Sequence, residues 1–145
     1  HRAIHVLVFR LDGRLFLQKR GLHKQESPGL WDSSVAGHVD AGETYDACCV
    51  REIEEEIGIR MEEMPKRLFK LVASPQTGME FCWVYRLVTD LELALDYTEM
   101  ETGQWFAQAQ VDQWLRDSAE DFAESFRTIW HRFSQCKEVD VVEYV

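Results

Sequence analysis

The sequence predicts an α/β sandwich in which a mixed β-sheet lies between helices. Three observations carry this prediction: two strand-like runs near the N-terminus are joined by Asp12-Gly13, an apolar run fills residues 79–89, and an aromatic stripe repeats at helical spacing in residues 119–135. This order of strands and helices places helices on both faces of a sheet. With 145 residues, 46% of them hydrophobic, the chain is long enough for one substantial core.

The first third of the chain is expected to contain three strands, over residues 3–10 (AIHVLVFR), 14–20 (RLFLQKR) and 30–36 (LWDSSVA). Asp12-Gly13 between the first two is a strong hairpin signal, because these residues readily adopt the positive φ of tight hairpin turns. Residues 21–29 form a polar loop that ends in Pro28-Gly29. The third strand leads directly into residues 37–59.

The C-terminal half is expected to contain strands over residues 68–73, 79–89 and 103–106, then helices over 111–117 and 119–135. The strand over 79–89 is apolar enough to be central in the sheet. The last helix carries apolar side chains at i, i+4, i+7 and i+11, namely Phe122, Phe126, Ile129 and Phe133. Such a stripe is typical of core packing rather than of a cofactor site.

Composition predicts one domain over residues 1–145. The chain has no internal repeat, no low-complexity tract and no apolar run as long as a membrane span. It starts at His1 without a signal-peptide pattern, and what precedes His1 stays open. Its four cysteines follow no metal-binding spacing, so a reduced, cytoplasmic setting is the simpler expectation.

The charge balance bears on partners. The net charge is −10, from 26 acidic against 16 basic residues, which argues against a long nucleic acid as the main partner. A small phosphorylated substrate stays compatible with it, because local basic residues can offset the field. The sequence leaves a homodimer open.

The most informative segment is residues 37–59, GHVDAGETYDACCVREIEEEIGI. On a helix, Glu52, Glu55 and Glu56 stand at i, i+3 and i+4 and share one face. The residues expected on the opposite face are Ala47, Val50, Ile53 and Ile57. Three like charges this close repel one another and favour a counter-ion. Oxygen ligands without a His or Cys pair indicate Mg²⁺ or Mn²⁺ rather than zinc; a solvated acidic face is the alternative.

The fixed positions of this segment resemble the signature of the Nudix hydrolases, G-x5-E-x7-R-E-U-x-E-E-x-G-U with U apolar, at every position. The resemblance implies a Nudix-type fold and a loop, helix and loop whose glutamates hold divalent metals on a substrate diphosphate. The metal ligands it implies are Glu52, Glu55, Glu56 and the carbonyl of Gly37. It implies that Arg51 and Glu43 hold the ligating carboxylates in place. Gly58 resembles a helix C-terminal glycine.

The flanking segments LFLQKRGLHK and PGLWDSSVAGHVD resemble the isopentenyl diphosphate isomerase-like branch of the same superfamily, and the likeness spans most of the chain. It implies that the basic residues Lys19, Arg20 and Lys24 hold a diphosphate. A solvated strand edge followed by a loop lysine is the alternative. His1 and His38 match positions that bind a metal in the isomerases.

One position separates this chain from the isomerases. They carry a catalytic Cys immediately before the Gly-His that matches Gly37-His38, and Ala36 stands there in this chain. An alanine can neither donate nor accept the required proton. The isomerase partner carboxylate has its counterpart in Glu80, so half of the catalytic pair is missing.

The leading hypothesis is a Mg²⁺-dependent hydrolase acting on a nucleoside diphosphate linked to another group, or on a related organic diphosphate, by attack of water at phosphorus. The proton acceptor is expected to be Glu52 or Glu55, with Glu80 in reserve. Isomerase-like activity and a non-catalytic nucleotide-binding module are the alternatives. Aromatic side chains that either stack on a base or belong to the core are Phe69, Trp83, Tyr85 and Trp105. Trp31 is either a wall of the pocket or part of the core.

Overall fold

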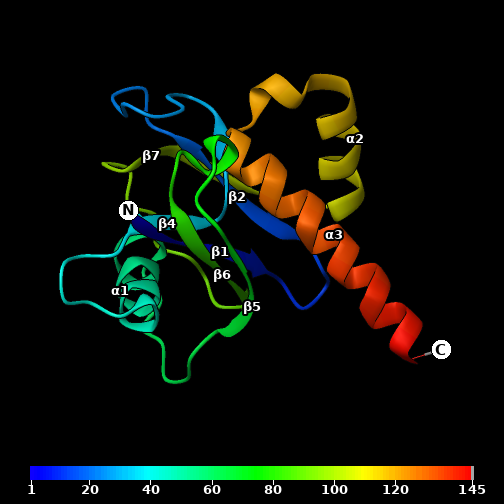
Figure 1. Cartoon of the computed structure of the whole chain (residues 1–145), viewed down its shortest axis with the longest axis horizontal. Helices are drawn as coiled ribbons and strands as arrows, with labels where there is room; N and C mark the ends of the chain where they lie inside the picture. The colour runs from blue at the N-terminus through cyan, green and yellow to red at the C-terminus, as the bar shows by residue number, and fades with distance from the viewer. Residues whose placement is uncertain (145) are drawn as a thin grey trace.

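A computed structural model describes residues 1–144, with side chains described through residue 136. The strands are β1 (Arg2–Phe9), β2 (Leu15–Arg20), β3 (Trp31–Asp32), β4 (Val35–His38), β5 (Lys66–Leu71), β6 (Phe81–Val88) and β7 (Met100–Phe106). The helices are α1 (Tyr45–Ile57), α2 (Gln108–Ser118) and α3 (Glu124–Tyr144), with short 3₁₀ turns at Pro75–Thr77 and Ala119–Asp121. Figure 1 shows α1 on one side of the strands and α2 and α3 on the other.

The strands form one mixed sheet in the order β3-β2-β1-β6-β5, with β4 also paired to β1 and β7 to β2. β1 and β6 run parallel, and every other pair is antiparallel. The predicted mixed sheet is therefore confirmed. β6 lies between β1 and β5, so its predicted central position is confirmed as well.

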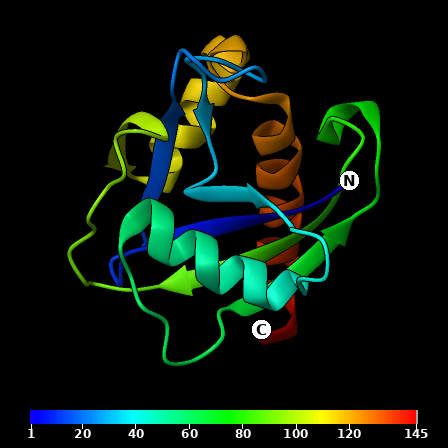
Figure 2. The ribbon, with the colours of Figure 1, turned by 90° about the vertical axis from the view of Figure 1, so that its left-hand side faces the viewer.

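β1 shows why helices cover both faces. Its residues alternate, so that Leu7 packs with Ile129 of α3 on one face, while Ile4 and Val6 pack with Ile53 of α1 on the other. A strand buried on both faces reads as a near-continuous apolar run, as residues 3–9 do here with His5 as the one polar residue. Figure 2 shows α1 and α3 on opposite sides of the sheet.

The predicted hairpin is present. Gly13 adopts a φ of +93°, and the backbone N–H of Arg10 donates to the carbonyl of Arg14 at 2.9 Å. The two strands pair only at Val8 and Phe9 of β1, because residues 3–6 of β1 pair with β4 instead. This exchange of partners brings the end of β4, and the motif that follows it, beside the start of β1.

Several predicted boundaries are wrong. β5 covers Lys66–Leu71 instead of 68–73, and α2 covers Gln108–Ser118 instead of 111–117. The strand expected over 30–36 is two short strands, because Ser33 and Ser34 turn their hydroxyl groups to β1: Ser34 Oγ accepts from Val8 N at 2.8 Å. The last helix begins at Glu124 instead of 119, and Phe122 precedes it in a bridge to Trp31. β7 begins at Met100, three residues before the expected start.

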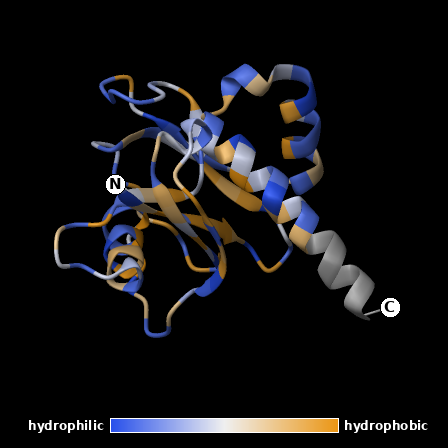
Figure 3. Ribbon diagram, viewed as in Figure 1, coloured by the Kyte–Doolittle hydropathy of each residue, from blue (hydrophilic) through white to orange (hydrophobic). Residues whose placement is uncertain are grey.

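The aromatic stripe nevertheless packs as predicted. Its four members, Phe122, Phe126, Ile129 and Phe133, are all buried in the core between α3 and the sheet. Figure 3 shows the hydrophobic residues concentrated in the strands and on the inner sides of the helices. None of the helices, over the residues described, has the length and apolar character needed to cross a membrane.

Candidate active site

The motif of residues 37–59 folds as the end of β4, a loop and α1. Thr44 caps the helix, with its Oγ1 accepting from Ala47 N at 3.0 Å. Gly58 ends it at a φ of +71°, and a Cβ there would lie 2.7 Å from Ala94 Cβ. The backbone N–H of Asp96 donates to the carbonyl of Glu56 at 3.0 Å. Both ends of α1 are therefore held in place, the first by a side-chain cap and the second by a backbone hydrogen bond and close packing.

The buried face of α1 differs from the predicted one. Ala47 is exposed and Val50 half-buried, whereas the buried side chains are Cys48, Cys49, Ile53, Glu56 and Ile57. At 100° per residue, Glu56 falls in the middle of that buried arc. The expectation that all three glutamates oppose the apolar face is thus wrong for Glu56. A carboxylate in the middle of a core-facing arc is costly to the fold unless it is paired.

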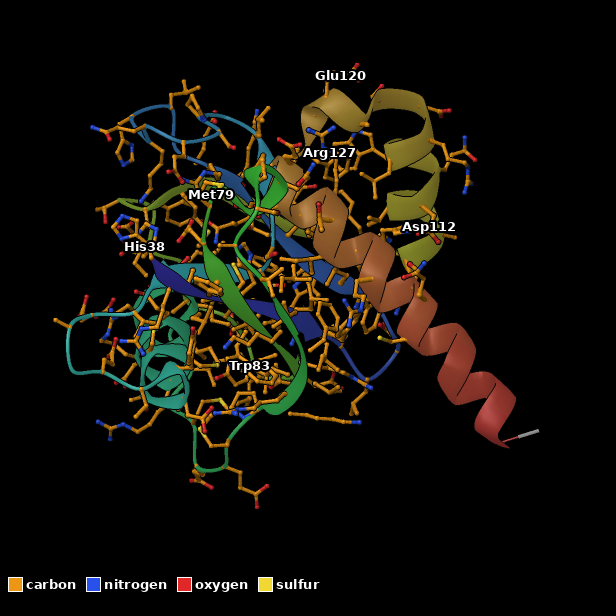
Figure 4. The ribbon with its side chains drawn as sticks, in the orientation of Figure 1. His38, Met79, Trp83, Asp112, Glu120 and Arg127 are labelled. Carbon is orange, nitrogen blue, oxygen red and sulfur yellow. The ribbon has the colours of Figure 1, made fainter. Side chains whose placement is uncertain are left out.

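All three glutamates line one cavity of about 470 Å³. Among the other predicted site residues, the cavity is also lined by Gly37, His38, Glu80, Arg20 and Lys24. His38 projects from the end of β4 (Figure 4), and its Nε2 lies 2.9 Å from Glu80 Oε2. Segments far apart in the sequence therefore converge on the residues of the motif.

Arg51 lies outside the lining of this cavity and contacts two of the carboxylates that line it, Glu52 and Glu55. Its guanidinium donates to both oxygens of Glu43, from Nε at 2.8 Å and from Nη2 at 2.9 Å. Its Nη1 donates to Glu52 Oε1 at 2.8 Å and to Glu55 Oε2 at 3.3 Å. A fork of this kind fixes the orientation of the carboxylates that it contacts. Arg51 thus contacts Glu52 directly, and Glu43 contacts Arg51, which is the arrangement that the motif resemblance implies.

The same contacts shift the pKa of Glu43. Hydrogen bonds from Arg51, then from the backbone of Asp40, lower this pKa from 4.5 to about 2. Arg51 in turn has its pKa raised, first by its hydrogen bond to Glu43. Both groups stay charged at neutral pH. The ion pair therefore continues to hold Arg51 in place beside Glu52 at pH values near neutrality.

Glu56 is the residue whose surroundings best fit a cation. Its side chain is 5% exposed, its Oε1 accepts from Gln18 Nε2 at 2.9 Å, and its Oε2 is buried without a hydrogen-bond partner among the described residues. Burial, followed by interaction with Glu52, raises its pKa well above 4.5. A buried carboxylate oxygen without a donor, beside other carboxylates, fits a hard divalent cation.

The side chains are not arranged as a finished ligand set. Over the residues with described side chains, no three His, Cys, Asp or Glu residues form a group able to hold a metal ion as they stand. Arg51 holds Glu52 and Glu55 by hydrogen bonds, and it is the cation that these two carboxylates contact. The donor types still fit Mg²⁺ or Mn²⁺, because all of them are oxygen.

The backbone of Gly37 approaches the carboxyl group of Glu52. A Cβ at position 37 would overlap this group, lying 2.6 Å from Glu52 Cγ. We expect Gly37→Ala to push Glu52 out of place and lower kcat by about 10- to 100-fold. Steady-state kinetics in Mg²⁺ and urea unfolding of the same variant check this. An unchanged kcat in a folded variant would contradict the close approach.

The structure separates the three predicted basic residues. Arg20 and Lys24 line the cavity, where Arg20 Nη1 lies 3.4 Å from Asp32 Oδ2 and Lys24 forms an ion pair with Glu99. Lys19 does not line it. Side chains alternate along β2, so Lys19 points away from the face of Gln18 and Arg20, toward Glu101 at 3.9 Å. Its substrate-binding role stays a prediction without support from the geometry.

Several cavity residues were not predicted from the sequence. They are His5, Glu26, Asp32, Asp40, Asp96 and Glu99; Gln18, which is not part of the lining, donates to Glu56. His5 is buried and bonds Ser33 Oγ through Nδ1 at 2.9 Å, and burial lowers its pKa. No local pattern marks these residues, because each reaches the site only through the fold. The aromatic side chains proposed for stacking line no part of the cavity and instead pack in or against the core.

Comparison with known proteins gives the family. The family model described as NUDIX domain matches residues 1–128. An isopentenyl-diphosphate Delta-isomerase of Burkholderia multivorans is 29% identical over 133 residues, 90% of this chain and 73% of the relative. A Nudix hydrolase of Listeria monocytogenes, described as uncharacterised, is 31% identical over 121 residues, 83% of this chain and 70% of the relative.

Among solved structures, the NUDIX domain of Shewanella oneidensis NrtR, crystallised with ADP ribose, is similar with a TM-score of 0.73. The match covers 92% of this chain and 85% of that one, at 13% identity, so it shows the fold alone. The hydrolase-named relative and the family model together support a hydrolase. Because the family model matches residues 1–128 of the 145, the chain belongs to the NUDIX domain family.

Proposed function

We propose that the protein hydrolyses a diphosphate bond with Mg²⁺ or Mn²⁺, in a nucleoside diphosphate linked to another group or in a related organic diphosphate. The observation that carries the proposal is the buried Oε2 of Glu56, which lacks a hydrogen-bond donor in a cavity that Glu52 and Glu55 also line. ADP ribose, which the NrtR domain of the same fold was crystallised with, is the analogy from which we choose a nucleoside diphosphate as the first substrate class to test.

The charge of the cavity supports a metal-bridged anion. Nine carboxylates line it, on Glu26, Asp32, Asp40, Glu52, Glu55, Glu56, Glu80, Asp96 and Glu99, against the two cations Arg20 and Lys24. A diphosphate entering alone would be repelled. Glu52, Glu55, Glu56 and the carbonyl of Gly37 would hold the metal, which when bound neutralises the phosphate oxygens and lowers the pKa of a nearby water.

The side chains then divide the work of the reaction. Arg20 and Lys24 bind phosphate oxygens as charged donors. A water oxygen attacks phosphorus, the bond to the bridging oxygen breaks, and the proton of the water passes to Glu52 or Glu55. Glu80 is the reserve acceptor, because it lies on the same cavity. Arg51 keeps Glu52 in position through the hydrogen bond at 2.8 Å.

Isomerisation of a short prenyl diphosphate is the second candidate, favoured by the similarity to the Burkholderia isomerase. Ala36 lines the cavity where the isomerases carry their catalytic Cys. Its methyl group cannot transfer a proton. We therefore expect no conversion of isopentenyl diphosphate to its dimethylallyl isomer, and formation of that isomer would reverse the ranking.

We also propose that the protein works in a reducing compartment such as the cytoplasm. All four cysteines are free, and Cys48, Cys49 and Cys82 are buried. Burial raises the pKa of each of these three thiols to about 12, which keeps them protonated and unreactive.

The test is a substrate panel with matched glutamate variants. Nucleotide sugars, dinucleotides, nucleoside triphosphates and prenyl diphosphates are incubated with the chain and Mg²⁺, and phosphate-containing products are quantified. We expect Glu55→Gln to lower kcat by about 10²-fold or more while folding persists. Glu54→Gln is the control, since Glu54 does not line the cavity and its carboxylate forms an ion pair with Arg60 at 3.9 Å. Equal activity of the two variants would overturn the proposal.

A further inference from the structure

We propose that the groove between α2 and α3 is a second binding site, for a small phosphate-bearing anion. This groove encloses about 410 Å³ and is lined by Asp112, Leu115, Arg116, Ala119, Arg127, Trp130, His131 and Ser134. It shares no lining residue with the catalytic cavity. Its volume falls within the usual range of small-molecule sites.

The groove gathers basic side chains from both helices. Arg127, His131 and Ser134 stand at i, i+4 and i+7 on α3, so they share the face that borders α2. Arg116 enters from α2, four residues after Asp112. Figure 4 marks Asp112 on α2 and Arg127 on α3, on the side of the sheet opposite α1.

Arg127 is the residue that indicates a ligand. Among residues 1–136, its buried Nε has no hydrogen-bond acceptor, and no carboxylate forms an ion pair with it. A buried guanidinium nitrogen without an acceptor is unfavourable, and such groups in folded proteins usually find a partner. An anion in the groove would supply the acceptor that the protein itself does not.

The single acid of the lining is already engaged. Asp112 Oδ1 accepts from Trp130 Nε1 at 2.7 Å. The two guanidinium groups of Arg116 and Arg127 therefore exceed the one carboxylate, in a chain whose net charge is −10. The planar fork of arginine matches a phosphate group, and Ser134 adds a neutral hydroxyl donor. Leu115 and Trp130 offer an apolar wall for an organic group attached to the phosphate.

Phosphate binding can be observed at the groove itself through the indole N–H of Trp130. The full chain, labelled with ¹⁵N and kept metal-free with a chelator, is titrated with inorganic phosphate and separately with AMP, at ionic strength matched with chloride. Trp130→Phe assigns the resonance. We expect a saturable shift of the Trp130 signal at low-millimolar phosphate, about 1–10 mM, while the Trp83 signal beside α1 stays fixed. Tighter binding of AMP would support the apolar wall.

Charge variants complete the test. Arg127→Gln should weaken binding by about tenfold or more, and Arg116→Gln, from the other helix, should weaken it as well. Arg132→Gln is the matched control on α3, since Arg132 lies over the ring of Phe69 outside the groove. A Trp130 signal that does not move by about 10 mM phosphate, or that moves equally in Arg127→Gln, overturns the proposal.

Discussion

Replacing Glu56 by Gln should abolish most of the Mg²⁺-dependent hydrolysis while leaving the metal-free fold as stable as before or more stable. Glu56 is buried and faces Glu52, and among the described residues its side chain accepts a hydrogen bond from the amide of Gln18. Gln removes the negative charge without changing the shape. We expect kcat to fall by about 10²- to 10⁴-fold, because the cavity loses the carboxylate that a divalent cation requires.

Stability and activity should therefore move in different directions. The folded-state pKa of Glu56 is raised above its unfolded value of 4.5, so the folded chain binds this proton more tightly. Ionised Glu56 therefore destabilises the folded chain. This destabilisation is absent below pH 4.5 and grows as pH rises toward the folded-state pKa. Urea unfolding in the presence of a chelator is measured at several pH values. The free energy of unfolding of Glu56→Gln should rise relative to that of the wild type from pH 4.5 upward. A variant that is both fully active and less stable would contradict both expectations.

Most of the motif could be predicted because its geometry is local. The spacing of Glu52, Glu55 and Glu56 and the terminal Gly58 all lie within one helix and its C-terminal end. The rotation of that helix on the sheet is not local. Cys48 and Cys49 fill the core where Ala47 and Val50 were expected, since similar apolar residues stand on both sides and packing against β1 and β6 decides between them.

The basic residues expected to bind the substrate also show that contacts between distant segments could not be predicted from the sequence. Lys19, Arg20 and Lys24 lie close together in the sequence, but strand alternation turns Lys19 away from the cavity that the other two line. Lys24 meets Glu99, 75 residues further along the chain, and Gln18 meets Glu56 across 38 residues. No periodicity records such pairs, so only the folded arrangement of β2, α1 and the segment before β7 identifies them.

Replacing Arg51 by Ala should lower both activity and stability, in contrast to the Glu56 variant. Arg51 is the shared donor for Glu43, Glu52 and Glu55, and its removal leaves these carboxylates to repel one another. Its side chain is 29% exposed, so the loss is smaller than for a fully buried ion pair, about 1–3 kcal/mol. Misplacement of Glu52 should lower kcat by about 10- to 100-fold.

The pH dependence and a double variant separate this network from a general loss of packing. Glu43 has a folded-state pKa of about 2 against 4.5, so its contribution is complete above pH 4.5 and is lost as pH falls toward 2. The stability gap between the wild type and Arg51→Ala should shrink over that window. Glu43→Gln in the Arg51→Ala background should restore part of the stability, since one uncompensated charge disappears. Arg51→Lys keeps the positive charge but loses the forked guanidinium group, so its stability should lie between those of the wild type and Arg51→Ala. A gap that stays constant from pH 6 to pH 2, with no rescue by Glu43→Gln, would mean that Arg51 acts through the packing of its aliphatic stem and not through the carboxylates.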